Sequence, residues 1–144
     1  MPQKKRTTQR PENLVRQIAI SSVAAGASVS AMHERGQEPR YDGSARLELS
    51  GTMVEPIRNA RAVEIVLYAS DRTSVGTSPT PWVGTIDVDP DKIRPVLFIS
   101  HQDFDRVFRL ALAGRLNHAL LVLTKPHYRT AYVIHLSFST HPEE

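Results

Sequence analysis

The sequence contains no cysteine among its 144 residues, and this absence removes several kinds of chemistry. Disulfide bonds, zinc–thiolate sites, iron–sulfur clusters and a cysteine nucleophile are all excluded. Aromatic residues are also few, at 6%, and their spacing is not that of a stacking platform for single-stranded nucleic acid. Composition therefore argues against several classes of enzyme before any motif is considered.

Several catalytic and binding motifs are missing as well. The chain has neither Gly-x-Ser-x-Gly nor Ser-x-x-Lys, and its glycines lack the spacing of a phosphate-binding loop. Asp87–Asp91 begins like a calcium loop, but Lys92 replaces the required glycine and Phe98 replaces the bidentate glutamate. We interpret Asp87–Asp91 as a turn between strands, and we expect no metal and no cofactor.

The charge is concentrated at the N-terminus. The chain has 18 Lys+Arg and 15 Asp+Glu, a formal charge of +3. Residues 1–16 hold five cations against Glu12, a net +4, so the remaining residues sum to −1. Residues 1–13 lack apolar side chains to bury, and we expect a disordered basic arm. The candidate nucleic-acid contacts are Lys4, Lys5, Arg6, Arg10 and Arg16.

Leu14–Met32 follows the arm and is rich in alanine and serine. A basic start and an apolar middle suggest an export signal, but Arg16, Gln17, several serines and Gly26 dilute the apolar run. The same residues make it too polar to span a bilayer. We therefore expect a cytoplasmic protein that does not contact a membrane.

The secondary structure of Leu14–Met32 has two interpretations. As a helix it would place Leu14, Ile18, Val29 and Met32 on one stripe; as strands, 15–20 and 27–32 would flank a small-residue turn. We favour a helix that packs closely on another element or on a second subunit. With a linker at 33–43, the whole segment 14–43 is expected to be weakly ordered.

Residues 44–140 show clearer patterns and are predicted to form one domain. From Ser44, apolar and polar residues alternate with the period of a half-buried strand, and 61–70 repeats this pattern across a short turn. Further strands are expected at 82–88, 94–100, 118–124 and 129–140. The polar loop 71–81 is long enough to suggest a functional or flexible segment.

One helix is predicted with a complete set of signals at residues 101–113. Ser100 and Asp103 have capping-box spacing, an apolar face begins at Phe104, and Gly114 fits the left-handed position after the last turn. The predicted fold is therefore an α+β domain. It consists of a mainly antiparallel sheet of about five strands, with this well-capped helix packed on one face.

The six histidines show no metal-binding spacing, because no pair follows a His-x-His or helical i, i+4 pattern. His118 and His135 lie on strands that a Lys-Pro turn would pair, and His101 precedes Asp103. These four residues are the only catalytic candidates, as a composite His/Asp site. Separate surface histidines are the simpler interpretation.

Three functions are consistent with these observations. The leading hypothesis is a non-enzymatic interaction or scaffold module that binds a protein partner or associates with itself, because catalytic motifs are missing and the sheet is strongly apolar. The alternative is a nucleic-acid-binding accessory protein that uses the basic arm. The third is a small enzyme with the composite His/Asp site.

Overall fold

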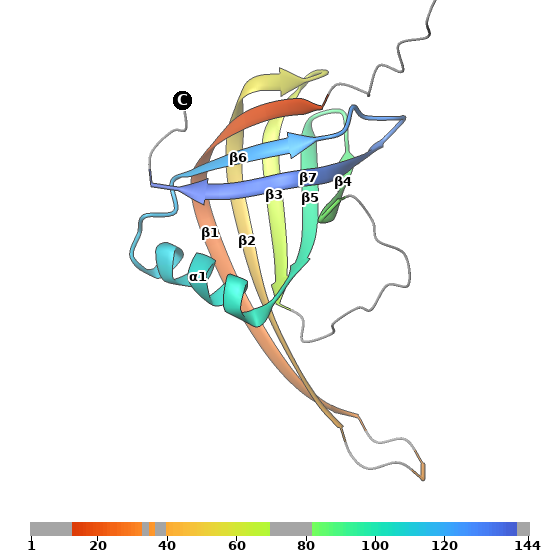
Figure 1. Ribbon diagram of the computed structural model, residues 1–144, viewed down its shortest axis with the longest axis vertical. Helices are drawn as coiled ribbons and strands as arrows, with labels where there is room; N and C mark the ends of the chain where they lie inside the picture. The colour runs from red at the N-terminus through yellow and green to blue at the C-terminus, as the bar shows by residue number, and fades with distance from the viewer. Residues whose placement is uncertain (1–12, 33–34, 37–39, 70–81, 141–144) are drawn as a thin grey trace, which may run out of the picture.

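The computed structural model describes residues 13–32, 35–36, 40–69 and 82–140 (Figure 1). Seven strands in this part of the chain form a closed barrel, in the order β1-β2-β3-β5-β4-β7-β6, and one helix accompanies them. In chain order the elements are β1 (Leu14–Met32), β2 (Arg40–Ile57), β3 (Ala60–Ala69), β4 (Gly84–Val88), β5 (Lys92–Ile99), α1 (His101–Leu112), β6 (His118–Leu123) and β7 (Thr130–Ser139).

The barrel closes because β1 has two neighbours. It pairs with β2 from Ile18 to Met32, and with β6 from Leu14 to Ala19. All neighbouring strands are antiparallel except β3 and β5, which run parallel from Ala62 opposite Lys92 to Ala69 opposite Ile99. The chain reaches β5 through β4, which then lies on the far side of β5 and joins it to β7.

The predicted fold class is therefore wrong. The chain is not an α+β domain with an open, mainly antiparallel sheet of about five strands covered by a helix. It is a seven-stranded closed barrel with one short helix and one parallel strand pair. The alternating pattern gave the strands correctly but carries no information about closure, which depends on β1, the strand that the sequence did not identify.

The interior of the barrel is filled by apolar side chains. Every second residue of the strands points inward, and no polar or charged residue is buried in the described part of the chain. The largest side chains that are fully buried are Ile18, Leu47, Leu49, Met53, Ile57, Ile65, Leu67, Ile86, Ile93, Leu121, Leu123 and Val133. The barrel is thus a packed core and not a container.

Helix α1 begins and ends within one residue of the predicted helix. The Ser100 side chain accepts a hydrogen bond from the Asp103 N–H at 3.1 Å, and Gly114 has the left-handed φ of 67°. Phe104 is buried against the barrel core. The helix lies across one end of the barrel rather than on a sheet face (Figure 1), which is a further correction to the predicted packing.

The preference for a helix over Leu14–Met32 is also wrong, because this segment is β1. A bulge lies between Ile20 and Ser22 and shifts the alternation by one residue. Before the bulge, even-numbered residues such as Ile18 point inward; after it, odd-numbered residues such as Val23 do. The alternation of apolar and polar residues is therefore interrupted in the sequence. The predicted linker 33–43 is shorter than expected, since β2 already begins at Arg40.

Beyond the barrel, β1 and β2 continue as a two-stranded ribbon (Figure 1). The pairing of β2 with β3 ends at Ala45 opposite Ala69. Beyond this point β1 and β2 therefore pair only with each other in the described structure. We call this part, Ser28–Met32 with Arg40–Ser44, the ribbon. No helix in the described ranges is long and apolar enough to cross a membrane.

Candidate functional site

The four candidates for a His/Asp site lie in different places. His118 on β6 is opposite Ser139, whereas His135 on β7 is opposite Val122. The two histidines are thus four residues apart along the pair, about 13 Å at the rise of a strand. His101 and Asp103 are on α1, where the Asp103 carboxylate pairs with Arg106 at 3.5 Å. The structure does not bring His118 and His135 together.

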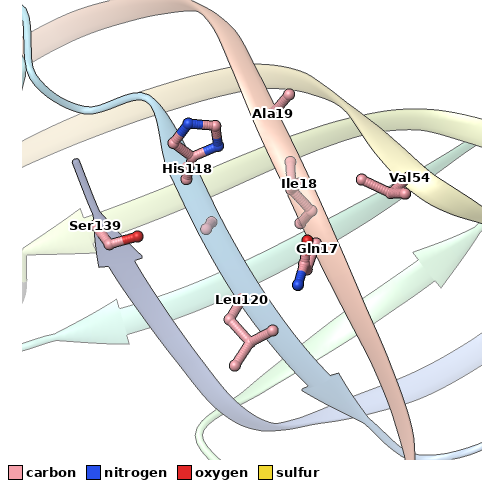
Figure 2. A pocket seen from close by; sticks show the side chains of 8 residues that line it. Gln17, Ile18, Ala19, Val54, His118, Leu120 and Ser139 are labelled. Carbon is pink, nitrogen blue, oxygen red and sulfur yellow. The ribbon is translucent and has the colours of Figure 1, made fainter. Parts of the chain in front are cut away.

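A small depression lies beside His118 on the outside of the barrel (Figure 2). Its volume is about 210 Å³, and it is mainly apolar. Gln17, His118 and Ser139 supply its polar groups, from β1, β6 and β7. Among the described residues, no three His, Asp or Glu side chains are grouped to hold a metal ion. None of the described residues that line the depression is an acid.

A larger, open groove of about 370 Å³ lies between α1 and the end of the barrel. Its walls are apolar, with Val107 and Leu110 from the helix facing Ile99 and Phe138 from the barrel. The Asp103–Arg106 ion pair stands at its rim. The groove shows that α1 closes this end of the barrel incompletely.

The barrel surface carries one cluster of charges with a perturbed titration. Glu64 on β3 accepts a hydrogen bond from Arg94 on β5 at 3.2 Å, and Lys92 lies at 3.5 Å. The Arg94 hydrogen bond and the two cationic charges hold the pKa of Glu64 below its ordinary value, while partial burial opposes them. This cluster joins the two parallel strands, so we interpret it as structural.

Most of the basic arm lies outside the described residues. This holds for Lys4, Lys5, Arg6 and Arg10, and the predicted loop 71–81 is outside them as well. Arg16 is described: it lies 3.8 Å from Glu55 and donates to the Pro56 carbonyl oxygen at 3.4 Å. Arg16 is therefore part of the barrel wall.

A row of large side chains crosses the outer face of β2, β3 and β5, beside Gly26 of β1. Gly26 on β1 is opposite Arg46 on β2, Arg46 is opposite Tyr68 on β3, and Tyr68 is opposite Phe98 on β5. The rings of Tyr68 and Phe98 stack at 5.2 Å with an interplanar angle of 19°, and Phe98 is 69% exposed. Arg46 also pairs with Glu48 at 3.6 Å. We call the side chains of Arg46, Tyr68 and Phe98 the aromatic row.

The second notable surface is an edge of β1. Beyond Ile20, whose N–H donates to the Asn117 carbonyl oxygen, no described strand pairs with the side of β1 that faces away from β2. We call Ser22–Met32 on this side the free edge. Residues 22–29 are exposed except for Gly26, which is half-buried. The edge thus presents unpaired backbone N–H and C=O groups to solvent.

The free edge lacks the features that normally prevent strand pairing. Native edge strands are protected by charged side chains, proline or a covering element. From Gln17 to Met32 the sequence has no Asp, Glu, Lys, Arg or proline. An accessible, uncharged strand edge can accept another strand, so the free edge is the candidate functional site.

Neither surface was identified from the sequence. Phe98 lies in the strongly apolar run 94–100, and Tyr68 is thirty positions away from it in the chain. The bulge at Ser21 interrupts the alternating pattern of β1, so the strand and its free edge were not predicted. The absence of charged residues from Gln17 to Met32 was a signal that the sequence did contain. No protein-family model, curated protein or solved structure matches this chain.

Proposed function

We propose that the protein is a non-enzymatic interaction module that binds a polypeptide strand along the free edge of β1. The observation that carries this proposal is the edge itself: Ser22–Met32 is uncharged and unpaired on one side in the described structure, and residues 22–29 within it are accessible. Strand addition to such an edge gains main-chain hydrogen bonds and places alternate side chains on each face of the sheet.

The barrel provides a rigid support for this edge. β2 holds the other side of β1 along its whole length beyond Ile18, and β3 in turn holds β2 as far as Ala45. An isolated two-stranded ribbon is marginally stable in water. The barrel therefore pre-forms the strand to which the partner pairs, which lowers the ordering cost of binding.

A cytoplasmic location is part of this proposal. The segment that resembled an export signal is β1, and Ile18 within it is 1% exposed in the barrel core. Cleavage near Ala31 would remove a strand that closes the barrel, which argues against processing at that position.

The proposal is tested by hydrogen exchange with a strand-forming probe. We expect that a short peptide of alternating Thr and Val, with Lys at each end, slows amide exchange in Ser22–Met32 and leaves Leu14–Ala19 unchanged. The protein is kept dilute so that its own chains do not compete. An edge whose exchange is unchanged by excess peptide, in a chain that stays monomeric in light scattering, overturns the proposal.

A proline variant provides the specific control. Backbone N–H groups point alternately to the two sides of a strand, and the Ile20 N–H points away from β2. Because the bulge shifts this alternation by one residue, the odd-numbered Ala25 also directs its N–H away from β2, to the free edge. Ala25→Pro removes this donor while leaving the pairing with β2 in place, as proline is tolerated where its nitrogen faces solvent. We expect Ala25→Pro to abolish the protection and Ala25→Thr to retain it.

The aromatic row favours a second candidate function, the binding of single-stranded nucleic acid. Bases stack on exposed aromatic side chains, and an adjacent arginine contacts the phosphates or stacks in turn. Phe98 and Tyr68 supply the rings and Arg46 the cation. The basic residues Lys4, Lys5, Arg6 and Arg10 would add a salt-dependent contribution.

Fluorescence anisotropy with a labelled oligothymidylate tests this second function. We expect Phe98→Ala to weaken binding by about tenfold, the value of roughly 1–3 kcal/mol for one stacked base. Val54→Ala, which changes an exposed side chain on a different strand, is the matched control. Binding that is absent, or that is unaffected by Phe98→Ala, contradicts a role of the aromatic row.

A further inference from the structure

We infer that the strand bound at the free edge is the same segment of a second copy of this chain, antiparallel and in the register that places Gly26 opposite Gly26. The inference rests on the proposed function and names its partner. Antiparallel pairing of identical segments is a closed two-fold arrangement, in which each position on one copy meets its counterpart on the other.

The sequence of the free edge is nearly symmetric about Gly26. Moving outward in both directions, the paired positions are Ala25 and Ala27, Ala24 and Ser28, and Val23 and Val29. In the antiparallel pair, each residue on one side of Gly26 therefore faces a residue of the same or similar size from the second copy. Two copies of this strand can therefore pair antiparallel without a mismatch in side-chain size.

The register also covers side chains that the single chain leaves exposed. Val23 is opposite Leu49 and Ala25 is opposite Leu47 on β2, and both leucines point into the core. Val23 and Val29 lie on this inner face, yet they are 41% and 80% exposed. In the Gly26-centred pair, Val23 of each copy lies beside Val29 of the other, so all four valines gain a β-branched neighbour.

Other registers do not produce these contacts. A shift of two residues in either direction keeps the same faces together but places Val23 opposite residue 27 or residue 31. Both valine pairs are then lost. Shifts that put inner-face residues opposite outer-face residues are incompatible with the pleat, in which opposite residues share a face.

The absence of charge distinguishes a second copy from an unrelated partner. At a two-fold axis, identical residues approach each other, so a charged residue near the axis would meet a like charge. The strand itself carries none from Gln17 to Met32, and Arg46, which lies beside Gly26 on β2, is paired with Glu48 at 3.6 Å. A surface selected for a charged partner would carry complementary charges along the edge, and none is present on the free edge.

Cysteine cross-linking tests the register directly, because the chain has no cysteine of its own. Opposite residues of an antiparallel pair have Cα atoms about 4.5–5.5 Å apart, which suits a disulfide. Cysteine fits at position 26, where a Cβ would lie 3.7 Å from the Arg46 guanidinium. We expect Gly26→Cys to form a disulfide-linked dimer under mild oxidation.

Ser22→Cys is the matched control on the same edge. In the Gly26-centred register, position 22 is opposite position 30, so the two copies of residue 22 are about 26 Å apart along the pair. We expect no cross-link for Ser22→Cys. Light scattering of the unmodified full chain is expected to give twice the mass of one chain in the micromolar range, and Ala25→Pro is expected to give the monomer.

Each outcome decides between the two proposals. A dimer that cross-links at Gly26→Cys and not at Ser22→Cys supports the inference. A dimer with the reverse pattern, or one indifferent to Ala25→Pro, overturns it. A monomer whose free edge still binds the Thr/Val peptide also overturns the inference while leaving the proposed function intact; a monomer that binds no peptide overturns both.

Discussion

The two halves of β1 belong to one strand but have different environments. In Leu14–Ile20 the strand pairs with β6 as far as Ala19 and with β2 from Ile18 onward, and Ile18 is almost fully buried in the core. Ser22–Met32 has β2 on one side only, and Val29 within it is 80% exposed. A single bulge at Ser21 separates the half that closes the barrel from the half that is free to pair.

This difference separates stability from function along one strand. The first half carries the buried Ile18 and pairs with β6, and β2 pairs on its other side from Ile18 onward, which closes the barrel. The second half has small uncharged residues and one unpaired edge, which gives little stability to a single chain and suits pairing with another. Substitutions in the two halves are therefore expected to have separate effects, on unfolding and on association.

The largest effect is expected at Ile18. Ile18→Ala removes a fully buried side chain and leaves a cavity, which costs about 2–5 kcal/mol of the free energy of unfolding. Val29→Ala, in the exposed half, is expected to change it by less than about 0.5 kcal/mol in the dilute monomer. Urea unfolding of both variants measures the contrast. Equal losses would show that the free-edge half is also part of the core.

The sequence predicted much of the fold at the level of single elements. Strands were expected close to the observed bounds of β3, β5, β6 and β7, because their apolar residues alternate or run continuously into the core. The turn between β2 and β3 was also predicted correctly. Closure was not predicted, because it depends on the pairing of β1 with β6, whose paired residues are 99 to 109 positions apart in the chain.

A second effect is expected at Gly51 on β2, where a side chain would meet the backbone of β1. A Cβ at this position would lie well inside van der Waals contact with the Ala19 carbonyl oxygen and would touch Ile18. Gly51→Ala is therefore expected to cost about 1–3 kcal/mol, as overpacked sites do. Gly43→Ala is the control in the ribbon, since its Cβ would meet no atom within 4 Å. Thermal unfolding of both variants measures the difference, and a loss at Gly43 comparable to that at Gly51 would contradict it.

The candidate site was harder to predict than the fold, for physical reasons. The aromatic row combines Arg46, Tyr68 and Phe98 from three strands, and only the register between those strands brings them into line. The free edge is the side of β1 on which no described strand pairs. A sequence pattern indicates which face of a strand is buried, but it does not indicate which edge is paired. The lack of charge from Gln17 to Met32 was the one local signal.

A smaller effect is expected where α1 covers the barrel end. Ser100→Ala removes the acceptor of the Asp103 N–H and is expected to cost about 1 kcal/mol. Ser100→Asp restores an acceptor and is expected to recover most of this loss. Hydrogen exchange would localise the effect: faster exchange in α1 with no change in Ser28–Met32 is expected. Faster exchange in the ribbon would mean that the helix also supports it.

The smallest effect concerns the pH dependence of the barrel wall at Glu64. Its pKa is lowered in the folded chain, chiefly by the Arg94 hydrogen bond, so the ionised carboxylate favours folding. This stabilisation is present above the ordinary glutamate pKa of 4.5 and is lost as the pH falls through the lower folded value. Glu64→Gln is therefore expected to lower Tm at pH 7 and to have no effect at strongly acidic pH.

Arg94→Gln should remove most of the same pH dependence, because it removes its main cause. If Glu64→Gln lowered Tm equally at every pH, the contribution of Glu64 would come from packing and not from its charge.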